Sequence, residues 1–179
     1  MSRVVAVLAV MLLGVTQTAW AHGPTRQKVV ESVEIARPPE QIWALVKDFD
    51  AIAKWLPGVV ASPADHGNEI GSIRVVTLAS GGKITEQLER YDDAAHSYFY
   101  RIIDVDVKVL PVNNYSSTLE VKASEDGKGS VVLWRGAFYR GYPNNDPPPE
   151  LNDDAAIKAV TDVYRAGLDH LKQLAENGK

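Results

Sequence analysis

The chain of 179 residues contains no cysteine. This absence excludes disulfide bonds, a thiol nucleophile and a cysteine-ligated metal site, so the fold must be stabilised by packing alone. The four histidines are also not spaced as metal ligands, and we expect neither a metal nor a cofactor. They are His22, His66, His96 and His170.

Long hydrophobic runs and basic clusters are missing as well. The longest apolar run, residues 4–15, has about twelve residues, whereas a membrane-spanning helix needs about twenty. With 19 basic and 23 acidic residues the net charge is −4, which argues against nucleic acid and anionic membrane surfaces as partners. The sequence also lacks a phosphate-binding glycine loop and the Gly-x-Ser-x-Gly elbow of hydrolases.

The first residues have the features of an export signal. Arg3 precedes the apolar run, and Ala19-Trp20-Ala21 follows it as a small-x-small cleavage site. We therefore expect residues 1–21 to be a signal peptide cleaved after Ala21, and residues 22–179 to form a single exported domain with no membrane contact of its own.

Hydrophobic periodicity predicts one order of elements along this domain. A strand at 28–36 precedes a helix that opens at Pro38-Pro39, and a short second helix covers 51–56. A long helix begins at the N-cap Asn152 and runs about 23 residues to Glu176. The strands between them are 59–61, 71–80, 83–91, 97–103, 115–122 and 130–139.

Short turns join these strands, so the sheet should be antiparallel. The long amphipathic helix must lie across one face of the sheet, because neither can bury its apolar side alone. The fold class is therefore α+β: a curved antiparallel sheet of about six to seven strands wrapped around a long C-terminal helix, with two short helices after the first strand. Such an arrangement leaves room for a cavity.

Several spaced motifs resemble the START-like, Bet v 1-like superfamily, which is also called SRPBCC and includes polyketide cyclases/dehydrases and lipid-transport proteins. The resemblance implies a helix-grip fold over the whole domain. The motifs are P-P-x-x-I-W-x-x-x-x-D-F (38–49), W-L-P (55–57), G-x-x-R (71–74), G-G-x-x-x-E (81–86), Y-D-D (91–93), N-Y-x-S-x-L-x-V (114–121) and W-R-G-x-F (134–138).

The export signal, the start HGPTRQKVVE and the pattern FYRG…PP-x-LNDDAA look most like the MxaD-type accessory proteins of methanol oxidation. This resemblance implies a periplasmic location and a non-enzymatic role beside methanol dehydrogenase, in its electron transfer to cytochrome c. Two alternatives stay open: a carrier of a small hydrophobic ligand, and a cyclase- or hydrolase-like enzyme.

The plant abscisic-acid receptors look like more distant relatives. Their hormone-binding lysine falls on Val60 here, and the residues of their gate and latch are not kept at 80–83 and 110–112. The resemblance therefore does not imply hormone-type gating.

Glu86 lies on the apolar face of its strand, between Ile84 and Leu88, where a carboxylate is costly without a partner. Arg74 shares the corresponding face of the preceding strand. A three-residue hairpin loop would place Val76 opposite Glu86 and Arg74 diagonal to it, within reach of a long side chain. We expect a buried pair that is structural or orients a ligand; no second group is evident that would make Glu86 a general acid, and no catalytic residue is assigned.

Other residues are candidates for the wall of the cavity. They would surround Arg74 and Glu86 with an apolar pocket that has few polar groups, or they would fill a core in which tyrosine hydroxyls bond one another. Gly167, inside the long helix, would make room for a ligand or allow close packing. The other candidates are Tyr98, Tyr100, Tyr115, Ser117 and Trp134.

The proline-rich loop 141–152 is a candidate partner surface. Its prolines limit the entropy lost on binding, and acidic residues would attract a basic partner. The alternative is a solvated connector whose acids start the last helix. The acidic residues are Asp146, Glu150, Asp153 and Asp154.

Overall fold

A computed structural model describes residues 23–177. The predicted signal peptide, residues 1–21, lies outside the described residues. The strands are β1 (Gln27–Ile35), β2 (Val59–Ala61), β3 (Ile73–Leu78), β4 (Lys83–Asp92), β5 (Ser97–Val105), β6 (Val112–Ala123) and β7 (Ser130–Arg140). The helices are α1 (Pro39–Val46) and α2 (Asp153–Glu176), with 3-10 turns η1 (Phe49–Lys54) and η2 (Pro149–Leu151).

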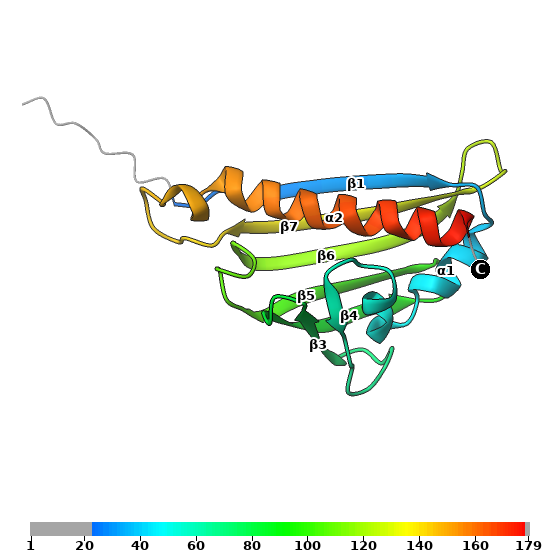
Figure 1. Ribbon diagram of the computed structural model, residues 1–179, viewed down its shortest axis with the longest axis horizontal. Helices are drawn as coiled ribbons and strands as arrows, with labels where there is room; N and C mark the ends of the chain where they lie inside the picture. The colour runs from blue at the N-terminus through cyan, green and yellow to red at the C-terminus, as the bar shows by residue number, and fades with distance from the viewer. Residues whose placement is uncertain (1–22, 178–179) are drawn as a thin grey trace, which may run out of the picture.

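The seven strands form one antiparallel sheet in the order β1-β7-β6-β5-β4-β3-β2. Helix α2 runs along β1 and β7 (Figure 1). Helix α1 contacts β6 and β7, and η1 contacts β2 and β3. This confirms the predicted α+β helix-grip fold. Between residues 23 and 177, no helix is long and apolar enough to cross a membrane.

The long helix begins where its capping chemistry predicts. The side chain of Asn152 accepts a hydrogen bond from the Ala155 amide at 2.8 Å, and Asp153 and Asp154 occupy the first turn, where the helix dipole favours acids. Its inner face carries the residues that pack on the sheet: Ala156, Val160, Tyr164, Gly167, Leu168 and Leu171.

The predicted second short helix is present as a 3-10 helix, and it starts two residues earlier than expected, at Phe49. The expected register of one hairpin was wrong. In the β3–β4 hairpin, Arg74 lies directly opposite Glu86 and Val76 lies opposite Ile84. The turn closes one residue earlier than assumed, because Gly81 takes the positive φ of 89° and Leu78 exchanges backbone hydrogen bonds with Gly81 and Gly82.

Candidate functional site

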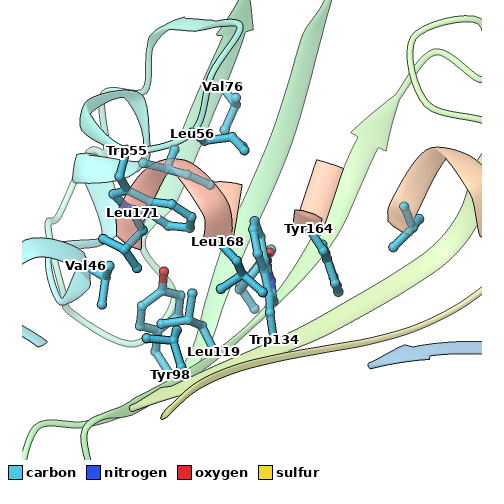
Figure 2. Close-up of a cluster of buried hydrophobic side chains, with 14 of the residues drawn as sticks. Val46, Trp55, Leu56, Val76, Tyr98, Leu119, Trp134, Tyr164, Leu168 and Leu171 are labelled. Carbon is cyan, nitrogen blue, oxygen red and sulfur yellow. Dashed lines mark hydrogen bonds between the residues drawn. The ribbon is translucent and has the colours of Figure 1, made fainter. Parts of the chain in front are cut away.

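A cavity of about 290 Å³ lies between the inner face of the sheet and α2. Leu56 and Val76 meet on one side of it and Trp134 forms part of the opposite wall (Figure 2). The lining is mostly aliphatic and aromatic, the usual composition of a small-molecule site. It consists of Leu56, Pro57, Val59, Val76, Leu78, Ile84, Glu86, Tyr100, Ile102, Val109, Leu110, Tyr115, Trp134, Asp162, Val163 and Ala166.

The carboxylate of Glu86 lines the inner wall of the cavity. Arg74, which is not part of the lining, forms an ion pair with it. Arg74 Nε donates to Glu86 Oε2 at 2.6 Å, and Arg74 Nη1 donates to the Phe49 carbonyl at 2.6 Å. The guanidinium also lies over the rings of Phe49 and Tyr100, at 4.1 and 4.9 Å from their centroids. Burial lowers the pKa of Arg74, but the facing carboxylate of Glu86 raises it to a net value above the usual range. Arg74 is therefore a permanent cation that neutralises Glu86.

A directed chain of hydrogen bonds forms the second polar part of the wall. The Ser117 hydroxyl donates to the Arg135 carbonyl at 2.9 Å, so it accepts from Tyr164 at 2.8 Å. Tyr164 in turn accepts from Tyr115. Each hydroxyl has one proton, so this direction is the one that uses all three.

Trp134 and Tyr100 make a separate contact in the same wall. Trp134 Nε1 donates to the Tyr100 hydroxyl at 3.1 Å, and the Trp134 ring stacks on Tyr164 at 4.2 Å between centroids (Figure 2). Burial raises the pKa of Tyr100, Tyr115 and Tyr164 well above the usual value of 10. These phenols are therefore neutral at physiological pH and do not serve as bases.

The cavity brings together four of the eight sequence-predicted residues: Glu86, Tyr100, Tyr115 and Trp134. Arg74, Tyr98 and Ser117 are buried behind the wall. Tyr98 has a pKa raised by burial and packs on Phe49 and Tyr100. Both alternatives for the tyrosines therefore hold in part, since a cavity exists and hydroxyls bond one another around it.

Gly167 serves close packing and opens no space. A Cβ at this position would lie 2.9 Å from Leu56 Cδ1, 3.0 Å from Trp134 Cζ3 and 3.2 Å from Trp55 Cζ3. Because Gly167 has no side chain, Leu56, Trp55 and Trp134 can pack directly against the helix. Gly167 thereby sets where Leu56 and Trp134 stand as cavity walls.

Sequence reasoning did not identify the mouth of the cavity or Tyr164. The mouth lies at the exposed lining residues Pro57, Asp162, Val163 and Ala166, and the β5–β6 connection adds Val109 and Leu110 to the lining. Val109 packs against Gly82, so the β5–β6 connection meets the β3–β4 hairpin. The one sequence signal was Gly136, a glycine inside a strand, which marks a close approach of another group. In the structure Gly136 pairs with Ser117 on the adjacent strand, and a Cβ on it would collide with the Tyr164 hydroxyl.

The acidic loop is organised by a single buried cation. Arg140 is 8% exposed; it donates to the carbonyls of Tyr142 and Asn144 and pairs with Asp153 at 3.1 Å. Asp153 is thus engaged within the chain, whereas Asp146, Glu150 and Asp154 are exposed. Of the four acids, three are free to meet a partner.

Comparisons with known proteins agree with this architecture. A family model described as polyketide cyclase / dehydrase and lipid transport matches residues 26–176. The abscisic acid receptor PYL7 of Arabidopsis thaliana is 36% identical over 146 residues, which cover 79% of this chain but 65% of the receptor, just under two thirds of its length. The receptor PYL10 of Oryza sativa subsp. japonica is 28% identical over 169 residues, covering 88% of this chain and 74% of the receptor.

Solved structures are similar over most of their length. The protein XoxI from Bacillus cereus has a TM-score of 0.70 and 31% identity, covering 83% of this chain and 94% of its own. A putative uncharacterized protein from Bacillus thuringiensis has a TM-score of 0.69 and 30% identity, with coverages of 82% and 97%.

Proposed function

This chain belongs to the polyketide cyclase/dehydrase and lipid transport family, and on that premise we propose that it is a non-enzymatic protein that binds a small, largely apolar ligand between its sheet and α2. The observation that carries the proposal is the cavity of about 290 Å³ with an apolar lining and few polar groups. The family match and the similar solved structure agree with the START-like motifs from which the fold was predicted.

The chemistry of the wall favours binding over catalysis. A general acid or base needs a side chain with a pKa near the working pH and a partner aimed at the same atom. The Glu86 carboxylate is held in an ion pair with Arg74. Burial keeps the nearby Tyr100 and Tyr115 protonated. Within residues 23–177 no group of three or more acids or histidines could hold a metal ion. A cyclase- or hydrolase-like activity therefore has no support in the cavity.

Native mass spectrometry of the purified protein tests the proposal, with one variant that blocks the cavity. Val163→Trp places an indole at the mouth, where Val163 is 36% exposed; Asp169→Trp adds the same group to an exposed position of α2 outside the lining. We expect a small bound molecule, or uptake of an added apolar alcohol, in the natural protein and in Asp169→Trp. Loss of that mass in Val163→Trp supports the cavity, and equal occupancy in all three proteins contradicts it.

A second proposal is that the protein is an exported accessory of methanol oxidation, with methanol dehydrogenase or its cytochrome c as partner. Its support is the resemblance of the export signal and terminal motifs to MxaD-type proteins, together with the likeness to XoxI over 94% of that chain. Cleavage after Ala21 and a periplasmic location belong to the same proposal. Dehydrogenase activity with cytochrome c as acceptor, measured with and without this protein, tests it; a rate that does not change contradicts it.

A further inference from the structure

The inner polar groups of the cavity are mostly hydrogen-bond acceptors. Glu86 uses Oε2 for Arg74, while its Oε1 has no hydrogen-bond partner in the part of the chain that the structure describes. Glu86 is 6% exposed and lines the cavity. Oε1 is therefore an acceptor that a ligand can reach.

The tyrosines add one more acceptor and a single donor. The proton of Tyr115 is committed to Tyr164 through the chain that ends on the Arg135 carbonyl, so Tyr115 presents only lone pairs. Tyr100 accepts from Trp134, and its own proton can turn toward the neighbouring Tyr115 hydroxyl or toward the cavity. Because the proton of Tyr115 is committed to Tyr164, Tyr100 is the hydroxyl of the wall that can donate to a ligand.

Among residues 23–177, no cationic side chain lines the cavity. Its lining contains no lysine, arginine or histidine. Arg74 is 0% exposed and absent from the lining, whereas Glu86, to which it donates, belongs to the lining. At the mouth, Asp162 adds a second carboxylate, which pairs with Lys158 on the outside of α2.

Resting on the proposed binding function, we infer that the cavity selects neutral ligands whose polar group donates a hydrogen bond, such as an alcohol, and rejects carboxylates. A hydroxyl donates to Glu86 Oε1 and accepts from Tyr100. A carboxylate offers only acceptors and places a charge beside Glu86 in an apolar space, where buried charges need a partner. An ammonium group is also disfavoured, because Arg74 already neutralises Glu86 and leaves no charge to replace the lost hydration.

The volume limits the size of the ligand. At about 30 Å³ per non-hydrogen atom, the packing of liquid water, the cavity of about 290 Å³ holds a molecule of roughly ten such atoms. Compounds with one phenylpropyl skeleton and different polar ends therefore compare the end groups at nearly constant size. The set is phenylpropanol, phenylpropylamine, phenylpropanoate and, without a polar end, propylbenzene.

Calorimetric titration of the purified protein with these four compounds tests the inference. We expect phenylpropanol to bind most tightly. The carboxylate should bind on the order of tenfold to a hundredfold more weakly, because it leaves buried polar groups without partners. If the carboxylate, the amine or propylbenzene equals or exceeds the alcohol, the inference is wrong while the binding function stands. If none of the four binds, the proposed function itself fails.

A double variant separates the role of the pair from that of the apolar wall. In Arg74→Met/Glu86→Leu the preference for phenylpropanol over propylbenzene should fall several-fold, because only the contact with Tyr100 remains, while propylbenzene still binds. The matched control is Arg101→Met/Glu89→Leu, which removes an exposed ion pair of 2.9 Å from the same region of β4 and β5 and should keep the preference. An undiminished preference in Arg74→Met/Glu86→Leu overturns the role of Glu86, and the four-compound series decides alone if that variant does not fold.

Discussion

Arg74 and Glu86 lie directly opposite each other on β3 and β4, and the Nε of Arg74 donates to the Oε2 of Glu86 at 2.6 Å. Their side chains are 0% and 8% exposed. The pair is thus almost entirely removed from water, yet one carboxylate oxygen still reaches the cavity. The same contact stabilises the sheet and supplies the cavity with its acceptor.

Glu86→Gln should destabilise the fold strongly. The change leaves the buried guanidinium of Arg74 without its charge partner, which typically costs about 3–5 kcal/mol in the free energy of unfolding. Arg74→Met/Glu86→Leu should recover much of that loss, because it removes both charges and keeps apolar volume. Urea denaturation of the three proteins measures this. An unchanged midpoint for Glu86→Gln would show that the two residues do not act as a buried pair.

Tyr164→Phe should cost more stability than Tyr115→Phe. Tyr164 stands in the middle of the chain, so its hydroxyl serves two hydrogen bonds, whereas Tyr115 begins the chain and serves one. A buried polar group left without a partner costs about 1–3 kcal/mol. Thermal unfolding of both single variants and of the double variant checks the order. Strictly additive losses in the double variant would contradict a shared chain.

Stability at acid pH should depend on Asp93. Its carboxylate accepts from Trp43 Nε1 at 2.7 Å and from the Tyr91 hydroxyl at 3.3 Å. The hydrogen bond from Trp43 is the main cause that lowers the pKa of Asp93 below its ordinary value of 3.8, against a smaller opposing effect of burial. Because the folded pKa is the lower one, this contribution is present above pH 3.8 and is lost as the pH falls through the folded value.

Asp93→Asn should therefore flatten the loss of stability below about pH 4. Asp104→Asn is the control, because Asp104 is exposed and no side-chain hydrogen bond is assigned to it in the described chain. Denaturation midpoints at neutral pH and near pH 3 measure the difference. Equal acid slopes for the two variants would contradict the role of the Trp43 contact.

Charge reversal in the acidic loop should slow association with a basic partner. Asp146→Lys/Glu150→Lys changes two exposed acids and leaves the Arg140–Asp153 pair in place. The effect on association with methanol dehydrogenase or its cytochrome should be largest at low salt, since screening weakens attraction between exposed charges. Glu69→Lys/Glu125→Lys makes the same change of net charge on other exposed connections and should associate normally. Equal slowing by both variants would remove the loop as a specific partner surface.

Much of the fold could be predicted because it follows from local periodicity. Alternation along β5 and β6 places Tyr98, Tyr100, Tyr115 and Ser117 on the inner face, as the structure does. Asn152 marks the start of α2 through its capping hydrogen bond. The pairing of Arg74 with Glu86 follows from both being on one face. The expected register was wrong by two residues, since Val76 lies opposite Ile84 and not opposite Glu86, because the backbone of Gly81 decides where the turn closes.

The site was less predictable, because a cavity depends on how distant segments meet. Val109 joins the cavity lining where it packs against Gly82 of another hairpin. Tyr164 joins Ser117 because α2 is rotated to place its hydroxyl over Gly136. Neither contact can be predicted from the residue pattern within a single segment. Gly167 was ambiguous for the same reason, since its neighbours Leu56, Trp55 and Trp134 come from two other elements.

Methyl-resolved NMR during titration with phenylpropanol tests the central claim most directly. Val76, Ile84, Val59 and Leu110 line the cavity, whereas Val131 and Leu133 point to the outer face of β7. Binding in the cavity predicts saturable shifts of the first set, with the second set unchanged. Shifts that stay absent up to the solubility limit of the alcohol, or that gather on Val131 and Leu133, would contradict a ligand between the sheet and α2.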